Sequence, residues 1–160
     1  GVLLARRLLE HGVSAVQVVQ NGWDTHDDNF RRVQKLGDQL DPAFSTLIDD
    51  LRRRGLYQDT LILCLGEFGR TPEIGAGDGR NHWPANWCVA FAGGRIRGGT
   101  VVGATDEPGE RIVERPVQVA DLFATVATAL GIDRDKEFLA GKRPVKLVDP
   151  DGKVVQELVG

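Results

Sequence analysis

The sequence predicts an α/β domain with a mainly parallel sheet flanked by helices, ending in a C-terminal β-hairpin. Helical and strand-like segments alternate along the chain, which is the order found in βαβ units. The run 59–66, DTLILCLG, is almost entirely apolar, as in strands that are buried on both faces of a parallel sheet. Two loops rich in polar side chains, 21–28 and 67–84, each follow a predicted strand. We expect residues 1–160 to form a single domain, because the chain is too short for two ordinary ones.

The first half of the chain predicts two helical regions and a strand between them. Apolar residues at helical spacing predict a helix over about 2–11, and Gly12 suits its exit. The β-branched run 13–20 predicts a strand. Residues 30–55 predict either one broken helix or two consecutive helices, because Asp41-Pro42 is a typical helix start.

The second half predicts shorter elements around one long loop. The turn-rich segment 67–84 follows the strand 59–66, and a loop of this length in a compact domain is usually functional or disordered. A strand is predicted over 85–94 and a helix over 117–132, with Asp121 in the first turn of that helix. The sequence Asp-Pro-Asp-Gly at 149–152 lies between two strand-like runs and predicts a hairpin.

Composition argues against two classes of partner. No segment approaches the roughly 20 apolar residues that a membrane span requires. The 20 basic and 23 acidic side chains give a net charge of −3 without a long block of either sign, so no positive field favours nucleic acid. Cys64 and Cys88 lie in apolar runs, where a free cysteine is usually buried, and the sequence does not decide whether they pair.

The loop QNGWDTHDDNF, residues 20–30, contains the first candidate metal ligands. Asp24 and His26 are two residues apart, so both side chains leave the same face of an extended backbone. A carboxylate oxygen and an imidazole nitrogen suit zinc or manganese better than calcium. Asp27 and Asp28 are either further ligands or first-turn carboxylates of the next helix. The alternative interpretation is a solvated turn in which Asp28 caps that helix.

The long loop 67–84 contains the second set of candidates. Glu67 leaves a predicted buried strand, and His82 precedes another, so each could bind a metal at a strand end. Arg70 offers a planar fork for phosphate or sulfate oxygens, and Arg80 could bind an anion or face solvent. Thr71 could be a nucleophile, although no activating base is adjacent to it.

Five segments of the chain resemble the DUF1501 family of bacterial proteins, a branch of the alkaline phosphatase and sulfatase superfamily. They occur in the family's order and read GWDTHDDN, GEFGRTP, GRNHWP, AGGRIRGGTVVGATDE and VQVADLFATVATALGI. The resemblance implies an alkaline-phosphatase-like α/β/α sandwich, here incomplete. It also implies one or two divalent metal ions (zinc, manganese or calcium), a nucleophile that the metal activates, and an exported or periplasmic protein.

Carried over by position, the resemblance implies that Asp24, His26 and His82 hold one metal ion. Glu67 would contribute to a second ion or bridge the two. Phe68 stands where the superfamily has a histidine, and this chain has an asparagine, at position 81, where the family usually has an aspartate. The nucleophile is expected upstream of residue 1, because the chain begins within a helical pattern and is expected to be the C-terminal part of a longer protein.

The sequence therefore predicts part of a metal-dependent hydrolase of phosphate or sulfate esters, either small molecules or polymers. We expect this part to be inactive without the missing N-terminal part of the same chain. Arg70 and Arg80 would hold the oxygens of the substrate. Two alternatives remain open: a non-catalytic exported binding domain, which Phe68 and Asn81 favour, and a phosphotransferase or mutase on the same scaffold.

Overall fold

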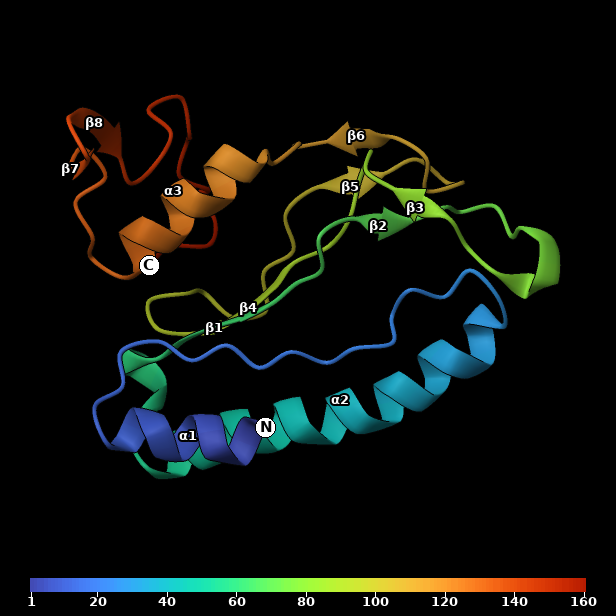
Figure 1. The fold of residues 1–160 in the computed structure, drawn as a ribbon, viewed down its shortest axis with the longest axis horizontal. Coiled ribbons are helices and arrows are strands. Elements are labelled where there is room, and N and C mark those ends of the chain that lie inside the picture. The colour runs from blue at the N-terminus through green and yellow to red at the C-terminus, as the bar shows by residue number, and fades with distance from the viewer. The chain divides into compact units, whose positions relative to one another are not determined.

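The computed structural model describes residues 1–160 and divides into two compact units (Figure 1). Unit 1 comprises Gly1–Tyr57 and Gly66–Cys88, and unit 2 comprises Gln58–Leu65 and Val89–Gly160. Each unit is therefore made of two stretches of chain. None of the helices is both long enough and apolar enough to cross a membrane.

Two helices form the framework of unit 1. The helix predicted near the start of the chain is confirmed as α1 (Val2–Glu10), which packs on α2 (Asn29–Arg53) in Figure 1. The Arg6 guanidinium is buried between them, and its Nε lies 2.7 Å from Asp50 Oδ2. This ion pair joins the two helices, because Arg6 belongs to α1 and Asp50 to α2.

The α2 helix runs without interruption through Pro42, so the predicted break at this position is wrong. Pro42 has no N–H to donate to the carbonyl of Asp38, four residues earlier. The apolar stripe nevertheless keeps its helical spacing on both sides of the proline. It consists of Val33, Leu36, Leu40, Phe44, Leu47 and Leu51. Because the stripe does not change phase, one continuous helix presents all of it to the same face, and its last member is fully buried.

The predicted strand over 13–20 is wrong. The segment is extended in Figure 1 but pairs with no strand. Two hydrogen bonds hold its ends: Val13 N donates to Leu8 O, and Gln20 Nε2 donates to Leu36 O. Its β-branched residues favour extended backbone, but a strand also requires a partner whose N–H and C=O groups are in register.

The predicted parallel sheet and α/β/α sandwich are also wrong, because every strand pair is antiparallel. The four two-stranded sheets are β1 (Leu61–Cys64) with β4 (Ala90–Gly93), β2 (Gly69–Arg70) with β3 (His82–Trp83), β5 (Ala104–Thr105) with β6 (Ile112–Glu114), and β7 (Glu137–Ala140) with β8 (Arg143–Lys146). Parallel strands need a long crossover, usually an α-helix, and no α-helix separates the two strands of any pair. The only helix between β1 and β4 is the short 3₁₀ helix η2 (Ala76–Asp78), which lies between β2 and β3 in the chain. A second 3₁₀ helix, η1 (Tyr57–Asp59), precedes β1.

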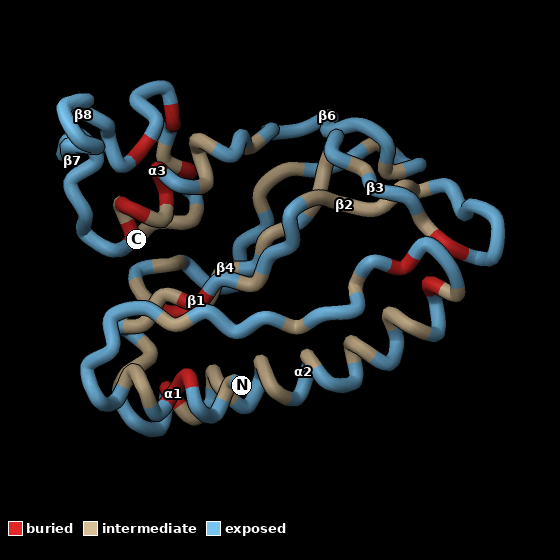
Figure 2. The backbone as a smooth tube through the Cα atoms, in the orientation of Figure 1, coloured by how far each residue is buried: buried red, intermediate tan, exposed pale blue.

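The core of unit 2 lies under its only α-helix, α3 (Val119–Ala129), which confirms the predicted helix with shorter bounds (Figure 2). Ala124 and Ala127 are buried against Val148, and Val154 packs beside them. Alanines on the inner face of the helix allow this close approach of the following chain.

The C-terminal hairpin forms earlier in the chain than predicted. Strands β7 and β8 pair around a turn in which Ala140 lies opposite Arg143. The predicted turn at 149–152 exists, since Gly152 N donates to Asp149 O at 3.0 Å, but strands do not flank it. The Asp149 side chain also accepts a hydrogen bond from the Asp151 N–H. This turn is therefore stabilised by its own residues and does not require paired strands on either side.

Both cysteines are free. Cys64 is partly buried in β1, but Cys88 is exposed, so the prediction that both are buried is wrong for Cys88. Cys88 lies outside the regular strand β4, which begins two residues later at Ala90.

Asp121 connects the start of α3 to the chain that follows the core. One carboxylate oxygen accepts from Lys153 N at 2.7 Å, and the other accepts from Gln118 N at 3.0 Å. These hydrogen bonds from Lys153 and then Gln118 hold the pKa of the Asp121 carboxyl below its usual range. The position of Asp121 in the first turn of the helix is confirmed.

We expect Asp121 to make unit 2 sensitive to acid. Because its pKa is lower in the folded chain than in the unfolded chain, its contribution to stability is present above the ordinary aspartate value of about 3.9. That contribution is lost as the pH falls further and the carboxylate is protonated. Urea unfolding at neutral and acidic pH should show a smaller loss of stability for Asp121→Asn than for the wild type, and an equal loss would contradict the assignment.

Candidate metal centre

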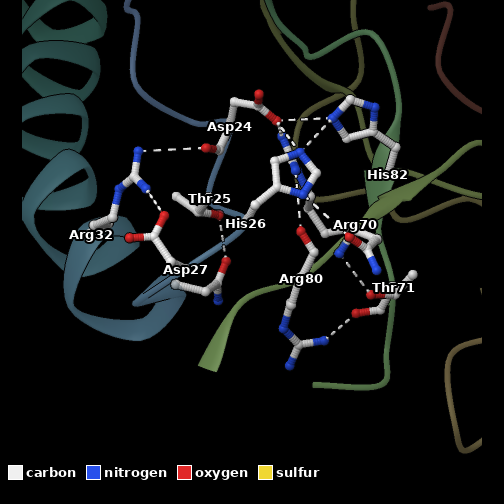
Figure 3. A network of polar contacts seen from close by, with 11 residues as sticks. Asp24, Thr25, His26, Asp27, Arg32, Arg70, Thr71, Arg80 and His82 are labelled. Atoms are coloured by element: carbon white, nitrogen blue, oxygen red, sulfur yellow. Dashed lines mark hydrogen bonds and ion pairs between the residues drawn. The ribbon is translucent and has the colours of Figure 1, made fainter. Parts of the chain in front are cut away.

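Three predicted ligand side chains meet on the surface of unit 1 (Figure 3). Asp24 Oδ1 lies 3.0 Å from His26 Nε2 and 2.9 Å from His82 Nε2. The two imidazole nitrogens lie 3.1 Å apart. We call Asp24, His26 and His82 the ligand cluster. Its atoms form a nearly equilateral triangle, and all three residues are exposed.

Asp24 and His26 are both exposed, whereas Thr25 between them is fully buried. This alternation places the side chains of Asp24 and His26 on the outside of the loop. Thr25 Oγ1 donates to Asn29 Oδ1 at 2.6 Å, and Asn29 is the first residue of α2. Thr25 was not among the residues predicted from the sequence, although the same alternation could have indicated it. This buried hydrogen bond attaches the loop to the helix.

We expect Thr25→Val to destabilise the protein by about 1–3 kcal/mol, because Asn29 Oδ1 would stay buried without its donor. Valine has almost the same shape as threonine, so the loss reports the hydroxyl. The matched control Thr25→Ser keeps the hydroxyl and loses one methyl group, which costs about 0.8 kcal/mol. Urea denaturation measures both values, and a valine variant as stable as the wild type would contradict the role of this bond.

His82 reaches the cluster through the short ladder of β2 and β3, in which it lies opposite Arg70. The loop that precedes β3 also contacts the loop of Asp24. Arg80 N donates to Thr25 O at 3.1 Å, so the backbone of one loop is bonded to the backbone of the other. Residues far apart in sequence are thereby held side by side.

Arg70 is the cation nearest to the ligand cluster. Its Nη2 donates to Asp24 Oδ1 at 2.7 Å, and its Nη1 donates to Arg80 O at 3.2 Å. The hydrogen bond from His82, followed by that from Arg70, holds the pKa of the Asp24 carboxyl well below its usual range. Asp24 therefore stays ionised throughout the neutral pH range and is available as an anionic ligand.

Arg80 occupies a different place from Arg70. Its Nη1 donates to Thr71 O at 2.6 Å and to Pro72 O at 2.8 Å. Its guanidinium carbon also lies 5.8 Å from the centre of the Phe30 ring. Arg80 thus holds the turn between β2 and β3, whereas Arg70 faces the ligand cluster.

The other residues singled out in the long loop lie outside the ligand cluster. Glu67 is exposed and is not a member of the group of converging ligand atoms. The Phe68 ring packs against the His82 imidazole, with their centres 4.3 Å apart, so it limits the orientation of that imidazole. The Thr71 hydroxyl donates to Glu73 O and accepts from Asn81 N.

The remaining two aspartates of the first loop pair with arginines at the start of α2. Asp27 Oδ1 lies 2.6 Å from Arg32 Nη1 (Figure 3), and Asp28 pairs with Arg31. Asp28 precedes the first helical residue, with a φ of 45°, but its side chain does not cap the helix. The two carboxylates therefore neutralise the charges of these arginines at the N-terminus of α2, where the helix dipole is positive.

The geometry of the ligand cluster fits a tetrahedral cation. Zinc bonds of about 2.0–2.1 Å place neighbouring ligand atoms about 3.3 Å apart, so the sides of the triangle need to widen by only about 0.2–0.4 Å. Both histidines present the same nitrogen, Nε2, to the shared position. Without a cation, three acceptor atoms so close together need shared protons, so a hydrogen-bonded surface cluster is the alternative arrangement.

These features define a mixed helix and strand protein with a candidate three-ligand cation site on its surface. The chain matches the family model described as "Protein of unknown function (DUF1501)" over residues 1–159, and it belongs to that family. The comparison with curated proteins and the comparison with solved structures each gave no match.

Proposed function

We propose that this chain functions in a metal-dependent hydrolase of phosphate or sulfate esters, with a divalent cation at the ligand cluster. One observation carries the proposal: a carboxylate oxygen and two imidazole nitrogens lie within 3.1 Å of one another on an exposed surface. Three protein ligands with an open fourth position are typical of catalytic zinc sites, whereas structural sites are closed by four.

Asp24, His26 and His82 would hold the cation, and Arg70 would bind the substrate. A bound cation would act as a Lewis acid on an oxygen of the ester. The planar guanidinium of Arg70 suits the remaining anionic oxygens, because it donates two parallel hydrogen bonds. Arg80 would act by holding the turn that carries Arg70 and His82, since it donates to carbonyls within that turn.

The choice of phosphate or sulfate esters follows the motif resemblance to the alkaline phosphatase and sulfatase superfamily, and so does the proposed export from the cytoplasm. The nucleophile is proposed to lie outside the ligand cluster. We do not assign this role to Thr71, whose hydroxyl is hydrogen-bonded to Glu73 O and Asn81 N and is not a member of the ligand cluster.

A non-catalytic binding domain is the second candidate. The ring of Phe68 stands where the superfamily has a histidine, and it packs on His82 rather than offering a ligand. Such a domain would keep one cation and bind an anionic partner through Arg70 without turnover.

Metal analysis and a turnover assay separate the two candidates. The full-length protein is purified, loaded with zinc or manganese, freed of excess ion and assayed with an aryl phosphate and an aryl sulfate. One bound ion per chain with turnover supports the hydrolase. One ion without turnover of either ester favours the binding domain, and the absence of stoichiometric metal would overturn both.

A further inference from the structure

The second ring nitrogen of His26 faces a neutral side chain. His26 Nε2 points toward Asp24 and His82, whereas His26 Nδ1 lies 3.2 Å from Asn81 Oδ1. A histidine that offers one nitrogen to a cation carries its proton on the other, and the hydrogen bond of that second nitrogen selects the tautomer. Asn81 is therefore placed where it can decide which nitrogen of His26 is free.

The backbone of Asn81 is fixed from two directions. Thr71 N donates to Asn81 O at 2.9 Å, and Asn81 N donates to Thr71 Oγ1 at 3.1 Å. Asn81 also directly precedes His82, the first residue of β3. The same short segment therefore carries the candidate ligand His82 and the residue that contacts the candidate ligand His26. Because both backbone groups are bonded to the same threonine, the side chain starts from a defined position.

We propose that Asn81 is a positioning residue that accepts the proton of His26 Nδ1 and so directs the Nε2 lone pair into the ligand cluster. The inference rests on the proposed cation site and adds a residue that sets its affinity for the cation. An amide oxygen orients the ring, but it raises the basicity of the imidazole less than a carboxylate does. The cation affinity of the wild type is accordingly lower than that of an otherwise identical site with aspartate at position 81.

The opposite orientation of the amide makes a contrary prediction. If Asn81 presented its NH₂ group to His26 Nδ1, the ring proton would lie on Nε2 and oppose cation binding. Removing the side chain would then strengthen binding instead of weakening it. The two orientations are thus distinguished by the sign of one measured change.

Cobalt(II) titration followed by visible absorption tests the proposal on three variants of the full protein. We expect Asn81→Asp to tighten binding about tenfold and Asn81→Ala to weaken it about tenfold, as is usual for partners of metal-bound histidines. The control Asn21→Asp adds the same charge at an exposed asparagine of the neighbouring loop, and we expect it to change affinity by less than about threefold. Unchanged or tighter binding by Asn81→Ala would overturn the proposal.

Nitrogen NMR of the metal-free protein gives an independent measurement. The chain has three histidines, so the long-range proton–nitrogen signals of His26 can be assigned with His11→Gln and His82→Gln. The spectra are recorded at about pH 8.5, about two units above the ordinary histidine value. Asp24 Oδ1 competes for the proton from the Nε2 side of the ring, so we expect a larger fraction of the Nδ1–H tautomer of His26 in the wild type than in Asn81→Ala. An equal or smaller fraction in the wild type would overturn the proposal even if no metal binds. Loss of metal binding with the expected difference would overturn only the proposed function.

Discussion

Replacing Asp24 with alanine is expected to lower the affinity for zinc or cobalt by more than about 100-fold, the upper limit for losing an outer partner of a metal ligand. Asp24 Oδ1 is the one anionic atom of the ligand cluster, and it lies within 3.0 Å of both imidazole nitrogens. Its removal takes away a ligand and also leaves Arg70 beside the position of the cation. Isothermal titration of the metal-free protein measures the change.

The fold should survive this substitution, because Asp24 is exposed and exposed ion pairs contribute about 1 kcal/mol or less. The matched control is Asp49→Ala, which removes an exposed aspartate from α2 in the same unit. We expect that control to bind metal like the wild type. Equal affinity of Asp24→Ala and Asp49→Ala would remove Asp24 from the site and leave the proposed function without its anionic ligand.

Replacing Gly79 with alanine is expected to have the second large effect. A Cβ atom at this position would lie 1.8 Å from His26 O and 2.7 Å from Asp27 N, so the loop backbone would have to move. Overpacking of this kind costs about 1–3 kcal/mol. Moving His26 by about 1 Å should also weaken cation binding, since misplacement of this size can cost about 100-fold in activity at a site.

The control for Gly79 is a glycine of the same unit that has free space. Gly37 lies within α2, and a Cβ atom there would meet nothing within 4 Å. We expect Gly37→Ala to raise the stability by up to about 1 kcal/mol through helix propensity and to leave metal binding unchanged. If Gly79→Ala also kept both its melting temperature and its metal affinity, the close contact with His26 would not be needed.

The three helices were predictable because their hydrogen bonds and side-chain spacing are local. The capping position of Asp121 and the apolar stripe of α2 can be read within a window of a few turns. The helix continues through Pro42, which by itself predicted a break, because the apolar stripe keeps its spacing on both sides. The strands were not predictable in the same way: β-branched residues at 13–20 favour an extended backbone, but only a partner strand makes a ladder.

Part of the candidate site could also be predicted. Residue type and spacing indicated Asp24, His26 and His82, and the structure brings these three together. The same reasoning included Glu67, which lies outside the cluster, because it assumed parallel strands whose ends meet at one edge. It did not distinguish Arg70 from Arg80, since the two arginines differ in which acceptors surround them and not in their local sequence.

The sequence by itself determined where the helices lie, although not the continuity of α2, and it determined the chemistry of the ligands and the shared face of Asp24 and His26. Each of these depends on neighbours within a few residues. Only the tertiary structure decided that His82 joins them, since the contact spans 56 residues and requires the β2–β3 ladder. It also decided that the Asn81 side chain contacts His26 Nδ1. Pairing over such distances depends on backbone hydrogen bonds that every residue type except proline can make as both donor and acceptor, so residue identity alone does not specify it.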